Sequence, residues 1–131
     1  MLNLSPREYQ KSIVETAKNA NTLVVLPTGL GKTLPALLLS IHRLKQYPNS
    51  KIILISPTKP LNDQHFQTFK SQLPELFVQI ELLTGTTLPK KRQTLFSQAD
   101  IIIATPQTIS NDLKNNLYNL ENVSLLIVDE C

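Results

Sequence analysis

The stretch VVLPTGLGKT, residues Val24–Thr33, decides the fold that we expect for this chain. Its apolar start predicts a buried strand, and its Gly-Lys-Thr end predicts a phosphate-binding loop that opens a helix. Glycines let backbone N–H groups face one concavity, and the start of a helix adds unpaired N–H groups and a positive dipole end. Lys32 would then reach the β- and γ-phosphates of ATP, and the Thr33 hydroxyl would bind Mg²⁺.

The loop departs from the common G-x-x-x-x-G-K-[ST] pattern because Leu26 stands where the first glycine is expected. Support comes from Ser124–Glu130, an apolar stretch that ends in two acids. In a parallel sheet the carboxyl ends of the strands share one rim, so these acids would arrive beside the loop. Asp129 would hold Mg²⁺ through water, and Glu130 would orient and deprotonate the attacking water.

Strand patterns alternate with helix patterns along the whole chain. The predicted strands are residues 23–26, 51–56, 78–83, 100–104 and the stretch that leads to the two acids. The predicted helices are residues 5–19, 32–47, 61–73, 90–98 and 108–115. This alternation predicts an α/β fold with a mostly parallel sheet flanked by helices, in a single domain without linkers or repeats.

Composition narrows the class of protein but does not identify a partner. The 131 residues suffice for one core, and the net charge of +3 tolerates nucleic acid without requiring it. The single cysteine excludes an internal disulfide and fits a reducing compartment. Since no apolar stretch approaches the ~18 residues of a membrane span and no signal peptide is recognisable, we expect a cytoplasmic protein without a membrane partner.

Several polar residues have both an ordinary and a functional interpretation. His65 falls inside a predicted helix without metal-ligand partners at zinc spacing, so a structural role is favoured over that of a catalytic base. His42 is interpreted in the same way. The basic run Lys90–Arg92 is more typical of a solvated helix end than of a nucleic-acid patch.

Six segments, in order, resemble the first RecA-like domain of superfamily 2 helicases. Besides the phosphate loop and the acid pair, the similar segments are Arg7–Gln10 (adenine-recognising motif), Ser56–Leu61 (motif Ia), Thr84-Gly85 (Thr-Gly motif) and Ala104–Thr108 (motif Ib). The amino-acid sequences of these segments are most similar to those of Hef-type archaeal helicases and their Fanconi anaemia M-type relatives. The resemblance implies a RecA-like P-loop NTPase fold, incomplete at its C-terminus, in which residues 1–131 are an ATP-binding domain truncated within motif II.

The resemblance also implies roles for individual residues. Nucleotide binding falls to Arg7, Gln10, Pro27, Thr28, Gly29, Leu30, Gly31, Lys32 and Thr33. Catalysis falls to Glu130 and Lys32, and metal binding to Thr33 and Asp129. Nucleic-acid binding falls to Thr58, Lys59, Pro60, Thr84, Gly85, Thr105, Pro106, Gln107 and Thr108.

Three functional interpretations remain open. The first is the N-terminal part of an ATP-dependent helicase that moves on forked or branched DNA in repair or replication-fork processing. Its arginine fingers would come from a second RecA-like domain, so this chain alone would hydrolyse ATP slowly. The second is a nucleotide-binding remnant without motor function. The third is another superfamily 2 member, because Cys131 is similar to Dicer-like helicases and RNA sensors, which implies double-stranded RNA as the alternative partner.

Overall fold

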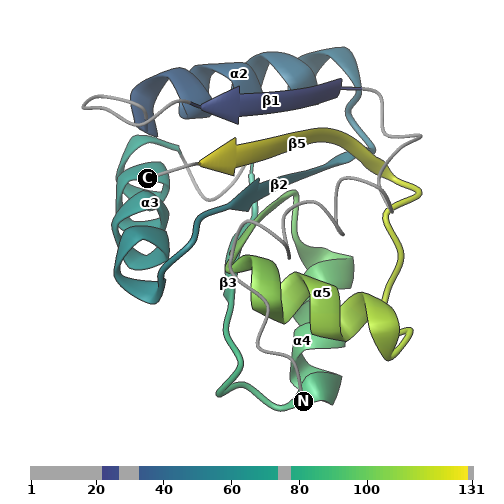
Figure 1. The fold of residues 1–131 in the computed structure, drawn as a ribbon. Coiled ribbons are helices and arrows are strands. Elements are labelled where there is room, and N and C mark those ends of the chain that lie inside the picture. Colours follow the sequence, from purple (N-terminus) through teal and green to yellow (C-terminus); the bar gives the residue numbers. More distant parts are fainter. Residues whose placement is uncertain (1–21, 27–32, 74–77, 130–131) are drawn as a thin grey trace.

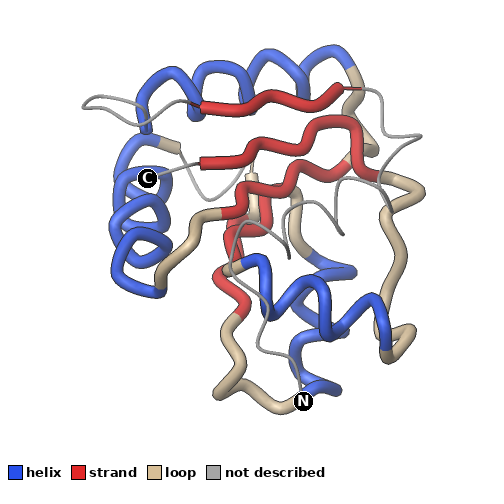
Figure 2. Tube along the Cα trace, in the orientation of Figure 1, coloured by secondary structure: helices blue, strands red, loops and turns tan. Residues whose placement is uncertain are grey.

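The computed structural model of this chain describes residues 22–26, 33–73 and 78–129 (Figure 1). The strands in this part are β1 (Thr22–Leu26), β2 (Lys51–Ile55), β3 (Ile80–Leu83), β4 (Ile101–Ala104) and β5 (Val123–Asp129). The helices are α2 (Thr33–Gln46), α3 (Lys59–Gln72), α4 (Pro89–Gln98) and α5 (Pro106–Lys114). Figure 2 shows how they alternate with the strands along the chain. The helix expected at residues 5–19 lies outside the described residues.

The strands form one sheet in the order β1-β5-β2-β4-β3, and every neighbouring pair is parallel. The predicted α/β fold is therefore confirmed. The last strand, β5, lies between β1 and β2, so the end of the described chain returns to the start of the fold (Figure 1).

Apolar side chains fill both faces of the sheet. Along β2, Ile53 and Ile55 pack on one face with Phe96 of α4 and Ile109 of α5. The alternate residues of β2 pack on the other face, together with Leu37 of α2, Phe69 of α3 and Leu73, the C-cap of α3. Because both faces are covered, the central strands are continuous apolar runs, and the side chains of residues 52–55 and 101–103 are fully buried.

Two helices begin two residues earlier than the sequence predicts. Helix α3 starts at Lys59 and α5 at Pro106, where we expected starts at residues 61 and 108. Thr58 and Thr105 are the N-caps, and each side chain accepts a hydrogen bond from a backbone N–H three residues on. A proline in each first turn lacks only an N–H that would have no partner there.

The basic run Lys90–Arg92 does not form a uniformly solvated helix end. Lys90 and Lys91 are exposed, but Arg92 is buried. Its guanidinium donates to both carboxylate oxygens of Asp112, at 2.7 Å from Nη2 and 2.9 Å from Nε, and so joins α4 to α5. The prediction failed at Arg92 because a partner 20 positions away in the sequence supplies the countercharge.

Tyr118 belongs to the same cluster as Arg92 and Asp112. Its environment leads us to expect that the fold loses stability at alkaline pH. Its hydroxyl donates to Asp112 at 2.8 Å, and its ring stacks on Phe96 with centroids 3.9 Å apart. Burial, together with the negative charge of Asp112, raises the pKa of Tyr118 above its ordinary value of 10.0. Above about pH 10 the unfolded chain releases this proton and the folded chain keeps it, so stability falls by up to about 1.4 kcal/mol per pH unit.

The alkaline decline should therefore be shallower in Tyr118→Phe than in the wild type when urea unfolding is measured at a series of pH values above about 10. Tyr47→Phe, at a position that is 40% exposed, is the control and should keep the wild-type slope. Parallel pH curves for wild type and Tyr118→Phe would contradict the prediction.

Candidate functional site

All five strands end on the same side of the sheet, which we call the carboxyl edge. Leu26 pairs with Asp129, and Ile55 pairs with both Val128 and Ala104. Leu83 also pairs with Ala104. The segments that follow the strands therefore emerge side by side, and α3 lies at this edge beyond the arrowhead of β5 (Figure 1).

The two strands that border the candidate nucleotide segments, β1 and β5, are neighbours at the carboxyl edge. Strand β1 ends at Leu26, immediately before the predicted phosphate loop, and Leu26 pairs with Asp129. Helix α2 begins at Thr33, immediately after the loop. The parallel register thus brings Asp129 to the strand end from which the loop departs, as the sequence predicted.

Asp129 is buried and has a histidine partner that the sequence analysis did not assign to it. The side chain of Asp129 is 1% exposed, and that of His65 on α3 is 5% exposed. Nε2 of His65 lies 2.9 Å from Oδ2 of Asp129. Because an ionised carboxylate only accepts hydrogen bonds, Nε2 carries the hydrogen and donates it.

Two more buried polar atoms lie on the same face of the sheet. Leu54 and Ile127 pack on the face covered by α2 and α3, and strand alternation puts Ser56 and Asp129 on that face as well. Asn62 is buried one turn before His65 on α3. Within the described residues, Ser56 Oγ and Asn62 Oδ1 are buried without a hydrogen-bond partner.

This set of donors fits Mg²⁺. A carboxylate with neutral oxygens nearby suits a hard cation that keeps several of its waters and is completed by substrate phosphates. No group of three or more His, Cys, Asp or Glu side chains that could hold a metal by themselves occurs in the described part of the chain. Asp129 would hold the ion, and Ser56 Oγ and Asn62 Oδ1 could accept hydrogen bonds from the waters bound to it.

The candidate nucleic-acid segments follow the remaining three strands, β2, β4 and β3, along the same edge. Thr58, Lys59 and Pro60 are exposed after β2. After β4, Gln107 is exposed and Pro106 is buried. The hydroxyls of Thr105 and Thr108 share a hydrogen bond of 3.1 Å, so these two threonines also stabilise the start of α5.

The buried guanidinium of Arg92 stabilises the turn after β3. Nη1 of Arg92 donates to the backbone carbonyls of Thr84 and Thr87, while the rest of the guanidinium binds Asp112. The hydroxyl of Thr84 also shares hydrogen bonds with those of Thr86 and Thr87. Gly85 is exposed, and within the described residues a Cβ added there would meet nothing within 4 Å.

Other predicted site residues lie outside the part of the chain that the structure describes. They are Arg7, Gln10, Pro27, Thr28, Gly29, Leu30, Gly31, Lys32 and Glu130. Thr33 is described only as the first residue of α2. Their assignments remain predictions.

Sequence reasoning missed His65, Asn62 and Arg92 as parts of this edge. A signal was present, because Asn62, His65 and Phe69 form the buried stripe of α3 at helical spacing. Arg92 and Phe96 form the corresponding stripe of α4. A polar residue within an inward-facing stripe needs a buried partner, and that requirement marks it for attention.

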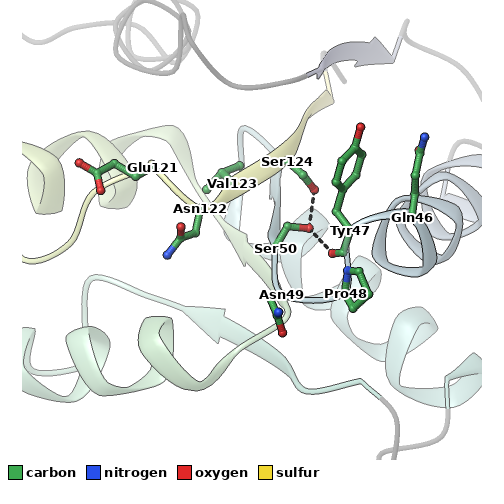
Figure 3. A pocket seen from close by; sticks show the side chains of 9 residues that line it. All are labelled: Gln46, Tyr47, Pro48, Asn49, Ser50, Glu121, Asn122, Val123 and Ser124. Carbon is green, nitrogen blue, oxygen red and sulfur yellow. Dashed lines mark hydrogen bonds between the residues drawn. The ribbon is translucent and has the colours of Figure 1, made fainter.

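A hollow at the opposite edge of the sheet contains none of the predicted site residues (Figure 3). It lies between the turn after α2 and the start of β5. Ser50 and Ser124 share a 2.7 Å hydrogen bond between their hydroxyls, and Ser50 Oγ also donates to the carbonyl of Tyr47. These contacts close the turn onto β5, so the hollow adds nothing to the carboxyl-edge site.

Residues 7–131 match the DEAD/DEAH box helicase family. The chain is 38% identical over 130 residues to the ATP-dependent DNA helicase mph1 of Neurospora crassa, covering 98% of this chain and 11% of that protein. It is 40% identical over 127 residues to a putative ATP-dependent RNA helicase of Methanocaldococcus jannaschii, covering 97% of this chain and 16% of that protein.

Among solved structures, the crystal structure of the Pyrococcus furiosus Hef helicase domain is similar, with a TM-score of 0.70 and 44% identity. The match covers 93% of this chain and 26% of that one. The chain thus spans only a small part of the relatives it matches. In the described residues no helix has the length and apolar character that crossing a bilayer requires.

Proposed function

The chain belongs to the DEAD/DEAH box helicase family and has the RecA-like α/β fold, and on that premise we propose that it binds and hydrolyses ATP for a DNA helicase or translocase. The observation that carries the proposal is the pairing of Leu26 with Asp129. It joins the strand that precedes the Gly-Lys-Thr segment to the strand that ends at Asp129, the first residue of the acid pair. Phosphoryl transfer from a nucleotide needs these two segments close together.

Each residue near the transferred phosphate has its own task. Lys32 binds the β- and γ-phosphates as a point charge, and backbone N–H groups of residues 28–33 surround them. Glu130 orients the attacking water and accepts its proton. Thr33 and Asp129 hold Mg²⁺, which when bound neutralises charge on the β- and γ-phosphates. Arg7 and Gln10 contact the adenine, for which the Gln amide offers both a donor and an acceptor.

The segments after β2, β4 and β3 grip a nucleic-acid backbone. They follow three neighbouring strands, β2, β4 and β3, so their hydroxyls, amides and backbone N–H groups would lie along one stretch of the carboxyl edge. Such groups contact phosphates and sugars and do not read base sequence. The surface therefore suits movement along a strand of any sequence.

We propose forked or branched DNA as the substrate, in DNA repair or replication-fork processing. The name of the N. crassa relative specifies DNA, and the similar solved domain is from Hef. The M. jannaschii relative carries an RNA helicase name, so double-stranded RNA is the competitor to test. We also propose that residues 1–131 alone hydrolyse ATP slowly, since an arginine finger supplied by another domain contributes roughly 10³–10⁵ in rate.

Binding to forked DNA tests the nucleic-acid surface through its salt dependence. Lys59→Ala should weaken binding and lower the slope of log K against log salt concentration by about one unit, because one phosphate contact and its released counterion are lost. Fluorescence anisotropy with labelled forked DNA, in competition with double-stranded RNA, measures both quantities.

Lys45→Ala is the matched control for this experiment. Lys45 is exposed in the last turn of α2, away from the carboxyl edge, and its replacement should leave the slope unchanged. Equal slopes for Lys59→Ala and Lys45→Ala would remove Lys59 from the surface, and tighter binding of double-stranded RNA than of forked DNA would reverse the choice of substrate.

A further inference from the structure

We propose that His65 is a positioning residue for the metal site and holds the Asp129 carboxylate in the orientation that binds Mg²⁺ with ATP. The proposal rests on the proposed function, since it needs a nucleotide and its metal at the carboxyl edge. It assigns to α3, the helix that continues from the motif Ia segment, a role in the nucleotide site, in addition to the predicted contact of that segment with nucleic acid.

The contact is direct and shielded from water. Nε2 of His65 lies 2.9 Å from Oδ2 of Asp129, and both side chains are almost completely buried. A carboxylate at the end of a strand can rotate about its side-chain bonds, and a donor fixed to one oxygen removes that freedom. A buried hydrogen bond to a charged group contributes more than one in water, so the hold is strong.

His65 is itself well anchored. It lies in the middle of α3, and the buried side chains of Asn62 and Phe69 lie about one turn to either side of it on the same face. Phe69 packs into the core against the sheet. The ring therefore cannot follow the carboxylate if the carboxylate turns, and the carboxylate keeps the orientation that α3 gives it.

The surroundings of the pair favour a role in ligand binding in addition to a packing role. If His65 served packing alone, the nearby polar atoms should be satisfied within the fold. Instead, Ser56 Oγ and Asn62 Oδ1 are buried on the same face without a partner in the described part of the chain. Unpaired buried oxygens near a held carboxylate are acceptors for the waters of a bound cation.

The test separates the metal-dependent part of nucleotide binding from the rest. The affinity for a fluorescent ATP analogue is measured with excess Mg²⁺ and again with EDTA, in the wild type and in His65 variants. His65→Phe keeps a ring but has no donor, and it should reduce the gain in affinity from Mg²⁺ by about 10-fold or more, in the range typical of residues that orient metal ligands. Affinity in EDTA should be unchanged, since it depends on the phosphate loop.

Two amide variants keep the test valid even if His65→Phe does not fold. The amide nitrogen of His65→Gln can reach a position close to that of Nε2, and it should keep most of the Mg²⁺-dependent gain. His65→Asn carries the same amide on a side chain one methylene shorter, and it should lose the gain. The exposed His42, replaced in His42→Gln, is the control for substitution of a histidine away from the site.

The outcomes distinguish this inference from the proposed function. Equal Mg²⁺-dependent gains in the wild type, His65→Phe and His65→Asn would overturn the role of His65 and leave nucleotide binding intact. If His65→Gln and His65→Asn lose the Mg²⁺-dependent gain equally, the amide of His65→Gln does not restore the contact with Asp129. That result would also overturn the role of His65. A wild-type protein that binds no nucleotide with or without Mg²⁺ would overturn both.

Discussion

Replacing Lys32 with alanine should reduce the affinity of the protein for ATP by about 100-fold or more. In the proposed site the Lys32 ammonium contacts the β- and γ-phosphates, and hydrogen bonds between charged groups contribute about 1.5–3 kcal/mol each. Loss of about 3 kcal/mol corresponds to roughly 100-fold in affinity. Titration of a fluorescent ATP analogue in the presence of Mg²⁺ measures the change directly.

The matched control is Lys45→Ala, which removes an exposed positive charge from the other end of the same helix, α2. It should bind ATP as the wild type does, and both variants should unfold at the wild-type temperature. If Lys32→Ala binds ATP with unchanged affinity, the Gly-Lys-Thr segment is not the phosphate loop and the proposed function fails.

The positions of the strands could be predicted because burial on both faces of the sheet requires a continuous run of apolar residues in the sequence. Residues 52–55 and 101–103 are continuous aliphatic runs, and in the structure their side chains are fully buried. That Asp129 lies on the same edge as the end of β1 also followed from the sequence, because parallel strands share one carboxyl edge. Only the strand order, which places β5 beside β1, required the structure.

The side-chain pairs could not be predicted, because their partners are far apart in the sequence. His65 and Asp129 are separated by 64 positions, and no local pattern connects them. The run Lys90–Arg92 has the composition of a solvated helix end, and only the packing of α5 turns Arg92 inward. A polar residue inside an apolar stripe indicates that a partner exists, but identifying the partner requires the tertiary fold.

The boundaries of α3 and α5 were predicted too late in the chain for a different reason. We set both starts after their prolines, whereas the capping threonines lie before them. Thr58 and Thr105 each cap a helix, and in the proposed function each would also contact nucleic acid. A side-chain hydroxyl that accepts the backbone N–H can still donate its own hydrogen to a phosphate, so the two roles are compatible.

Replacing Asp112 with alanine should lower the free energy of unfolding by about 3–5 kcal/mol, the largest effect on stability that we expect from a single substitution. Asp112 is fully buried and is the only carboxylate that the described residues place on Arg92. Removing it leaves a buried guanidinium without its countercharge, which costs far more than the net contribution of an intact ion pair. It also removes the acceptor for the hydroxyl of Tyr118.

The effect should depend on the unpaired charge more than on the lost contact. The double variant Arg92→Met with Asp112→Leu fills similar volume without charge, and it should be more stable than Asp112→Ala alone, since apolar replacement of a buried pair is often close to neutral. Urea unfolding of the single and double variants measures this difference.

Asp63→Ala, at an exposed position on α3, is the control for loss of an aspartate and should change stability by no more than about 0.5 kcal/mol. A loss below about 1 kcal/mol in Asp112→Ala would mean that Arg92 finds water or another acceptor when its partner is gone. In that case the turn after β3, whose Thr84 and Thr87 carbonyls Arg92 holds, would keep its shape without the ion pair. Forked-DNA binding by Asp112→Ala would then equal that of the wild type.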